Sequence, residues 1–428
     1  MKEVLAMIMA GGNGERLYPL TRERAKPAVP FGGVYRLVDF TLSNCVNSGV
    51  RKIVVLSQYK SLSLERHLRL GWNIFNSELD EYIFPIPPQM RINSDWYRGT
   101  ADSIYQNLYF ADSVNHEYFL ILSADHVYKM DYSKLLAFHK NSGADATVAT
   151  IEVDESACSH FGIMTVNEEN RIVGFKEKPT QIKSSSNRTL LANMGVYVFN
   201  SGVLREFLEE DAHKETQHDF GKDIIPEMIN RAKVFAYNFK DENKETIEYW
   251  RDVGTIDAYF KANMDMVKPN PKFDIHDAHW PIRTYQGQCP PARMVFAEEN
   301  TGEGMCVCLD SIVSGGCVIS GARVQNSVLS PQVWINNYSQ IEESVLMEDV
   351  EIGEYCRIKR AIIDKEVYVP PGTEIGYDLE EDRRRFFVSD SGIVVIAKGM
   401  RLPSSEKYGI QIRELSDDSH LLEAANCD

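Results

Sequence analysis

The residues best suited to chemistry lie in a glycine-rich stretch near the N-terminus, 10–27, with the sequence AGGNGERLYPLTRERAKP. Gly11 and Gly12 allow backbone N–H groups to approach a ligand closely, and the cations Arg16, Arg24 and Lys26 follow within sixteen residues of Gly11. This combination suits a polyphosphate. The stretch lacks the third glycine of GxGxxG and the GK[ST] ending of a P-loop, so it matches neither of these loops. A glycine turn alone is usually an ordinary loop, but its place directly after an apolar run favours a nucleotide site.

An acidic residue, Asp125, follows a second apolar run at 118–123. A carboxylate at the end of a buried strand commonly holds a divalent metal ion that bridges phosphates. From position alone, a helix N-cap for the segment that starts near Asp131 is an equally good interpretation. The next residue, His126, is better explained as structural than as catalytic, because nothing nearby in the sequence suggests a nucleophile for it to activate.

Four further segments place charged or aromatic residues beside glycine or proline at the edge of an apolar run. They are FKEKP at 175–179, LANMGVYVF at 191–199, HDFGKDIIP at 218–226 and WRDVGT at 250–255. Substrate contacts concentrate in loop ends near a sheet. Each segment by itself is more often a solvated turn, so the argument for a site depends on their number.

Alternating strands and helices must position these residues. The runs 4–9, 52–57 and 118–123 are continuously apolar, which is typical of buried parallel strands, while 100–111 and 132–139 have helical spacing. We therefore predict an α/β doubly wound sheet up to about residue 265. Ligands of such sheets bind beyond the carboxyl ends of the strands, which would bring the glycine-rich stretch and Asp125 to one crevice.

A different architecture is predicted for the C-terminal third of the chain. Three similar segments at 327–335, 344–352 and 361–369 are spaced by 17 residues, and a fourth at 311–319 precedes the first by 16. Small or β-branched aliphatic residues recur about every five or six positions within them. This hexapeptide periodicity indicates a parallel β-helix rather than a β-sandwich.

The sequence thus predicts domains at 1–267 and 305–428, joined by a linker at 268–304 that is rich in proline and polar residues. The flat faces of a β-helix favour oligomerisation. Near its end, EEDRRRFF at 380–387 contains three consecutive arginines. A salt-bridged surface is the simpler interpretation of this segment, and binding of an anion is the alternative.

Composition excludes several classes of protein. The net charge of −16 over 428 residues argues against a nucleic-acid or membrane binder, so local cations must hold any anionic substrate. The eight cysteines form no CxxC pair, which predicts reduced thiols, and Cys306 and Cys308 are better explained as strand thiols than as metal ligands. We expect no signal peptide, because the first strand follows Met1 and Lys2 almost directly, and no apolar run approaches the ~20 residues of a membrane span. We expect a cytoplasmic protein.

The glycine-rich stretch resembles the signature of the sugar-nucleotide pyrophosphorylases, a glycine loop followed by RL, a proline and KP. The resemblance runs from residue 4 to about 400 and includes RAKPAVPFGG, DFTLSNCVNSG, WYRGTAD at 96–102, HFGIM, EKP, HDFGKD and WRDVGT. Together with the C-terminal repeats, these motifs make the chain resemble the bacterial ADP-glucose pyrophosphorylases in particular. It implies a Rossmann-like doubly wound nucleotidyltransferase domain, a C-terminal left-handed parallel β-helix and a homotetramer.

This resemblance also implies a reaction, in which the adenylyl group of ATP is transferred to α-D-glucose 1-phosphate for glycogen or other α-glucan synthesis. The implied catalytic residues are Arg16, Lys26 and Asp125. Mg²⁺ would be held by Asp125 and Asp252. ATP would be bound by Gly11, Gly12, Arg16, Lys26, Tyr97 and Gly99. Glucose 1-phosphate would be bound by Gly162, Glu177, Lys178, Asn193, Tyr197, Phe220 and Trp250.

Some positions depart from the family pattern. Ala124 replaces a common glycine and Asn193 a common serine, so the shape of the pocket is expected to differ.

The resemblance implies regulation by anionic metabolites, for which the candidate residues are Arg24, Arg36, Arg384 and Arg385. Enteric members have a lysine where Glu23 stands and a histidine where Pro30 stands. Because the Glu23 carboxylate would repel a bisphosphate, we expect fructose 1,6-bisphosphate to be at most a weak activator.

Two alternatives remain. A UDP- or dTDP-sugar pyrophosphorylase of the same architecture is disfavoured by the length and specificity of the motifs. A non-catalytic regulatory subunit or scaffold would be expected to have lost some of the key residues. This chain keeps all five of them, Arg16, Lys26, Asp125, Lys178 and Asp252.

Overall fold

The computed structural model describes residues 1–89, 96–179, 190–241, 246–296 and 305–403. Part of the predicted linker, the predicted thiol Cys427 and the rest of the C-terminal tail lie outside these residues. The chain divides into two compact units, Met1–Gln288 and Cys289–Asp428. Among the described residues, no helix is long and apolar enough to cross a membrane.

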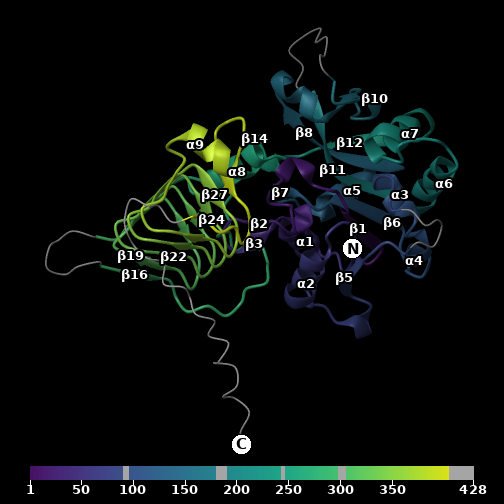
Figure 1. The fold of residues 1–428 in the computed structure, drawn as a ribbon. Coiled ribbons are helices and arrows are strands. Elements are labelled where there is room, and N and C mark those ends of the chain that lie inside the picture. Colours follow the sequence, from purple (N-terminus) through teal and green to yellow (C-terminus); the bar gives the residue numbers. More distant parts are fainter. Residues whose placement is uncertain (90–95, 180–189, 242–245, 297–304, 404–428) are drawn as a thin grey trace, which may run out of the picture. The chain divides into compact units, whose positions relative to one another are not determined.

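A nine-stranded sheet forms the centre of the first unit (Figure 1). Its strand β1 (Val4–Ala10) pairs in parallel with β4 (Lys52–Ser57) and β6 (Tyr118–Ser123), which confirms the three predicted strands. The other strands are β5 (Tyr82–Ile86), β8 (Ala146–Val153), β9 (Gly162–Val166), β10 (Ile172–Glu177), β11 (Leu190–Asn200) and β12 (Val234–Asn238). Because β11 runs antiparallel to β6, β8 and β9, the sheet is mixed beyond β6.

Helices cover both faces of this sheet, so the doubly wound prediction is confirmed. Successive residues of β1 alternate between two apolar cores, since Ala6 and Ile8 lie in one and Leu5 and Met7 in the other. The first core is covered by α1 (Leu37–Asn47), α2 (Leu62–Gly71) and α5 (Tyr132–Ser142). The second is covered by α3 (Thr100–Tyr105), α4 (Leu108–Asp112), α6 (Ser201–Ala212) and α7 (Ile225–Arg231).

The helix predicted over 100–111 is interrupted, because α3 and α4 are separate helices. Between them, Asn107 Nδ2 donates to the carbonyl oxygen of Ser103 (2.8 Å) and to Tyr97 Oη (2.9 Å). Asparagine side chains compete with the backbone for such bonds, which disfavours a continuous helix. The spacing of apolar residues, from which a single helix was predicted, carries no information about these side-chain hydrogen bonds.

Short elements carry the loops that surround the sheet. They are the helical turns η1 (Glu15–Leu17), η2 (Lys26–Ala28), η3 (Ser77–Leu79), η4 (Glu155–His160) and η5 (Phe220–Ile224), and the strands β2 (Pro30–Phe31), β3 (Tyr35–Arg36), β7 (His126–Tyr128), β13 (Lys240–Asp241), β14 (Thr246–Ile247) and β15 (Trp250–Asp252). The last helix of the unit, α8 (Ile256–Met266), fixes the turn at β2. Its Tyr259 Oη donates to the carbonyl oxygen of Pro30 (2.6 Å), and its Asn263 Oδ1 accepts from the Gly32 N–H (3.0 Å).

The segment after α8, predicted as the start of a linker, packs on the first unit. Phe273 is buried, and Trp280 Nε1 donates to Asn44 Oδ1 of α1 (2.9 Å). The N–H of Arg283 donates to Ser43 Oγ on the same helix (2.8 Å). Residues up to Gln288 therefore belong to the first compact unit.

The second unit is a parallel β-helix whose strands stack in three sheets (Figure 1). One sheet contains β16 (Arg293–Val295), β19 (Val318–Ser320), β22 (Trp334–Ile335), β25 (Glu351–Ile352) and β28 (Tyr368–Val369). The second contains β17 (Val307–Leu309), β20 (Arg323–Gln325), β23 (Gln340–Glu342), β26 (Arg357–Lys359) and β29 (Glu374–Ile375). The third contains β18 (Ile312–Val313), β21 (Val328–Leu329), β24 (Val345–Leu346), β27 (Ala361–Ile363), β31 (Val394–Ile396) and the antiparallel β30 (Phe387–Val388).

The register of these strands confirms the repeat. Val328 pairs with Val345, and Val345 pairs with Ile362, so each coil takes 17 residues here. Ser327 and Ser344 mark one corner, where the Ser344 N–H donates to Ser327 Oγ of the preceding coil (3.1 Å). Stacked aliphatic side chains fill the interior.

Candidate active site

Lys26 lies between two carboxylates that are distant from it in the sequence. Its Nζ is 2.7 Å from Asp125 Oδ2 and 3.4 Å from Asp252 Oδ1. Lys26 begins η2, Asp125 follows β6, and Asp252 ends β15, which pairs with β7 so that Asp252 is opposite His126. The structure thus brings the glycine-rich stretch and Asp125 together with the WRDVGT segment.

The charges in this cluster stabilise one another. Burial alone would raise the pKa of Asp125, but the charge of Lys26 and hydrogen bonds from Lys26 and Ser123 outweigh burial and hold that pKa below its usual range. Burial alone would lower the pKa of Lys26, yet the charges of Asp125 and Asp252 raise it above its usual value. Lys26 and Asp125 are therefore both charged at neutral pH.

The same cluster offers ligands for a divalent cation. Asp125, His126 and Asp252 each place one potential ligand atom within 4.8 Å of the others. Carboxylate oxygens are the ligands that Mg²⁺ prefers, so the two aspartates fit the predicted ion. The N-cap interpretation of Asp125 is excluded, because Asp131 caps α5 by accepting from the Ser133 N–H (2.8 Å).

Arg16 and Asp252 both lie beside Gly254, a residue that is not among the predicted site residues. A Cβ atom at Gly254 would lie 3.2 Å from Arg16 Nη2 and 3.1 Å from Asp252 Oδ1. Any side chain there would crowd both charged groups. The signal was present in the sequence, since Gly254 belongs to the WRDVGT segment. The side of Gly12 where a Cβ would point is open, with no atom within 4 Å.

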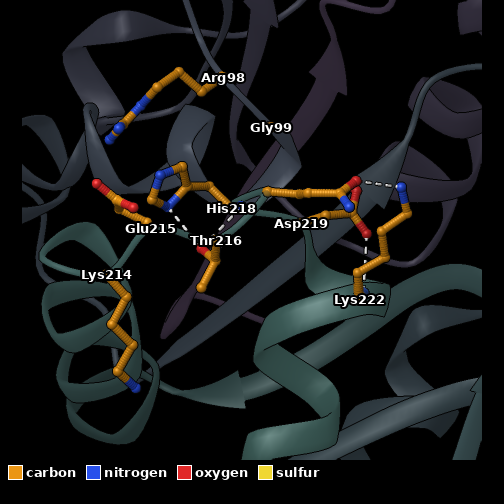
Figure 2. A pocket seen from close by; sticks show the side chains of 9 residues that line it. Arg98, Gly99, Lys214, Glu215, Thr216, His218, Asp219 and Lys222 are labelled. Atoms are coloured by element: carbon orange, nitrogen blue, oxygen red, sulfur yellow. Dashed lines mark hydrogen bonds between the residues drawn. The ribbon is translucent and has the colours of Figure 1, made fainter.

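Tyr97 and Gly99 lie in a segment that crosses the HDFGKD loop. The Tyr97 N–H donates to Gln58 Oε1 (2.9 Å), and a Cβ atom at Gly99 would lie 2.3 Å from the carbonyl oxygens of Gln217 and His218. No larger residue than glycine fits this crossing. A cavity of about 550 Å³ adjoins it (Figure 2). The cavity is lined by Arg98, Gly99, Lys214, Glu215, Thr216, Gln217, His218, Asp219 and Lys222.

Two of the residues predicted for the sugar phosphate, Gly162 and Lys178, lie beside Glu177. Its Oε2 would be 2.8 Å from a Cβ atom at Gly162. Lys178 follows with a half-exposed side chain whose Nζ is 3.5 Å from Glu177 Oε1. Asn193 Nδ2 donates to Tyr197 Oη (2.8 Å), so both side chains are oriented by each other.

The aromatic residues predicted for the sugar phosphate are all buried. The rings of Tyr197 and Phe220 stack with centroids 5.5 Å apart, and both are buried. Trp250 is buried as well, with its ring 5.0 Å from that of His126 and 5.3 Å from that of Phe161. The contact with Trp250 supports the structural interpretation of His126.

The arginines predicted for regulation have structural contacts. Arg24 is buried, and Arg36 Nη1 donates to the carbonyl oxygen of Ala28 (3.0 Å) and to Ser63 Oγ (2.9 Å). In the second unit, Arg384 and Arg385 lie in α9 (Leu379–Arg385) at 3.8 Å and 3.9 Å from Glu381. The last two contacts agree with the salt-bridged interpretation of EEDRRRFF.

Comparison with known proteins assigns both parts of the chain. Residues 5–268 match the family model "Nucleotidyl transferase", and residues 290–396 match "GlmU-like, C-terminal hexapeptide". The glucose-1-phosphate adenylyltransferase of Koribacter versatilis is 50% identical over 94% of this chain and 97% of its own length. That of Rhodopirellula baltica is 49% identical, over 94% and 92%. Glucose-1-phosphate adenylyltransferase 2 of Vibrio parahaemolyticus is 51% identical, over 92% and 98%. The chain therefore belongs to the glucose-1-phosphate adenylyltransferase family of nucleotidyl transferases.

Proposed function

We propose that this protein transfers the adenylyl group of ATP to α-D-glucose 1-phosphate, forming ADP-glucose and releasing pyrophosphate. The observation that carries the proposal is the cluster of Lys26, Asp125 and Asp252, in a chain about half identical to relatives named for that reaction. The phosphate of glucose 1-phosphate is already an anion, so its attack on the α-phosphorus requires positioning and charge neutralisation rather than a general base.

The nucleotide side of the site supplies the neutralising charge. Lys26, held by two carboxylates, would neutralise charge on the reacting phosphates. Arg16 is exposed beside Gly254 and would bind the departing β- and γ-phosphates. Mg²⁺ held by Asp125 and Asp252 would offset negative charge on the phosphates.

The sugar side would hold the acceptor. Glu177 and Asn193 would bind glucose hydroxyls, and Lys178 would bind the phosphate. Tyr197, Phe220 and Trp250 would exclude water from the same region.

The proposal predicts a nucleotide preference. With glucose 1-phosphate as acceptor, pyrophosphate release should be fastest with ATP when ATP, UTP, GTP and dTTP are compared, because ATP is the adenylyl donor. A coupled pyrophosphate assay measures it. Preference for UTP or dTTP would favour another sugar-nucleotide pyrophosphorylase, and no release with any nucleotide would favour a non-catalytic subunit.

We also propose that the β-helix unit assembles four chains, which the mass of the protein in solution would test.

We further propose that the enzyme is regulated by an anionic metabolite. Glu23 is exposed, with its Oε1 2.9 Å from Arg22 Nη2. Because Glu23 adds a negative charge that also engages the neighbouring Arg22, saturating fructose 1,6-bisphosphate should raise kcat/KM by less than about twofold. Titration beside fructose 6-phosphate and pyruvate measures this, and strong activation by the bisphosphate would contradict it.

A further inference from the structure

The crossing of two loops links the segments proposed for the two substrates. At Gly99 the nucleotide-side segment 96–102 touches the backbone of residues 217 and 218. The N–H of Ala101, in the first turn of α3, donates to the carbonyl oxygen of His218 (2.8 Å). The His218 ring is held in turn by Asp211 Oδ2, 2.7 Å from Nδ1. Figure 2 shows His218 beside Thr216 and Asp219 at this crossing.

Thr100, at the start of α3, makes two bonds across the crossing. Its Oγ1 donates to Asp219 Oδ2 (3.0 Å) and accepts from the N–H of Phe220 (3.0 Å). Asp219 uses its other oxygen, Oδ1, to accept from the N–H groups of Gly221 (2.9 Å) and Lys222 (3.2 Å). One hydroxyl therefore fixes both the carboxylate that caps η5 and the first N–H of η5.

The backbone held in this way faces the sugar side. A Cβ atom at Gly221 would lie 3.3 Å from Glu177 Oε2, so residue 221 is directly beside that carboxylate. The Phe220 ring stacks on Tyr197. Thr100 thus belongs by sequence to the nucleotide segment, but its two cross-loop contacts go to Asp219 and Phe220, which immediately precede the residue beside Glu177.

We propose that Thr100 is a positioning residue for the sugar phosphate, which acts by holding residues 219–221 against Glu177. This inference rests on the proposed function. Tyr97, by contrast, is held by Gln58 and Asn107, and neither of these contacts uses the Thr100 hydroxyl. Loss of that hydroxyl should therefore weaken the use of glucose 1-phosphate and leave the use of ATP intact.

The test is Thr100→Val, which keeps the side-chain shape and removes the hydroxyl. With two hydrogen bonds lost, one of them to a carboxylate, KM for glucose 1-phosphate should rise about tenfold while KM for ATP stays within about twofold. Thr100→Ser should restore the wild-type value. Thr100→Cys, with a weaker hydrogen-bonding group, should give an intermediate rise, and it decides the matter if the valine variant does not fold.

A matched control separates positioning from general stability. Thr147→Val removes a buried hydroxyl on β8 that lies 2.8 Å from His139 Nδ1. It should lower the melting temperature and leave both KM values unchanged. Unchanged KM for glucose 1-phosphate in Thr100→Val, or an equal rise for both substrates, would overturn the inference. If the wild-type protein released no pyrophosphate from ATP and glucose 1-phosphate, the proposed function itself would fail instead.

Discussion

Asp125→Asn is expected to lower kcat by about a thousandfold, which corresponds to ~4 kcal/mol of transition-state stabilisation. The amide keeps the shape of the side chain but carries no negative charge. Lys26 would then pair only with Asp252, and the cluster would lose one of its two carboxylate ligands for a divalent cation. Because Lys26 keeps Asp252 as a partner for its buried charge, the fold should tolerate the change, and the circular dichroism spectrum should stay that of the wild type.

Asp131→Asn is the matched control, since it makes the same chemical change six residues later. Asp131 caps α5 through the Ser133 N–H, and asparagine is as good an N-cap as aspartate. Its kcat should equal that of the wild type. Titration with Mn²⁺ followed by electron paramagnetic resonance gives a second measurement, in which only Asp125→Asn should bind the ion more weakly. Wild-type turnover in Asp125→Asn would exclude Asp125 as a metal ligand.

Periodicity was enough to predict the elements that repeat or lie in the core. The apolar runs at β1, β4 and β6 are central strands, and the 17-residue spacing of Val328, Val345 and Ile362 is the register of the β-helix. Both signals can be recognised within a short stretch of sequence, a single apolar run in one case and successive 17-residue repeats in the other. The antiparallel pairing of β11 with β6 and β8 was not predicted, because an apolar run indicates a strand but not the direction in which it pairs with its neighbours.

The site was predictable as a set of residues but not as an arrangement. Family motifs named Lys26, Asp125 and Asp252, yet the contact of Lys26 with Asp252 spans 226 positions and arises only from the fold. Thr100 and Gly254 were missed for the same reason. Their neighbours in the sequence were noted, but the partners that give them a role, Asp219 and Arg16, come from distant loops.

Lys178→Ala is expected to raise KM for glucose 1-phosphate roughly 10- to 100-fold, because a charge-assisted hydrogen bond to phosphate contributes about 1.5–3 kcal/mol. The Lys178 side chain is half-exposed, and its 3.5 Å contact with Glu177 is too long to restrain it, so it is free to turn toward a phosphate. No described contact joins it to the nucleotide-side residues Arg16 and Lys26. KM for ATP should therefore change by less than about twofold.

Lys176→Ala removes the same charge two residues earlier, from an exposed position on β10, and should leave both KM values unchanged. This control distinguishes a specific phosphate contact from a general loss of positive charge near an anionic substrate. Initial rates with each substrate varied at saturation of the other measure the four constants. If Lys178→Ala raised both KM values together, Lys178 would act on the whole site rather than on the sugar phosphate. If it raised neither, the phosphate would have to be held by another cation.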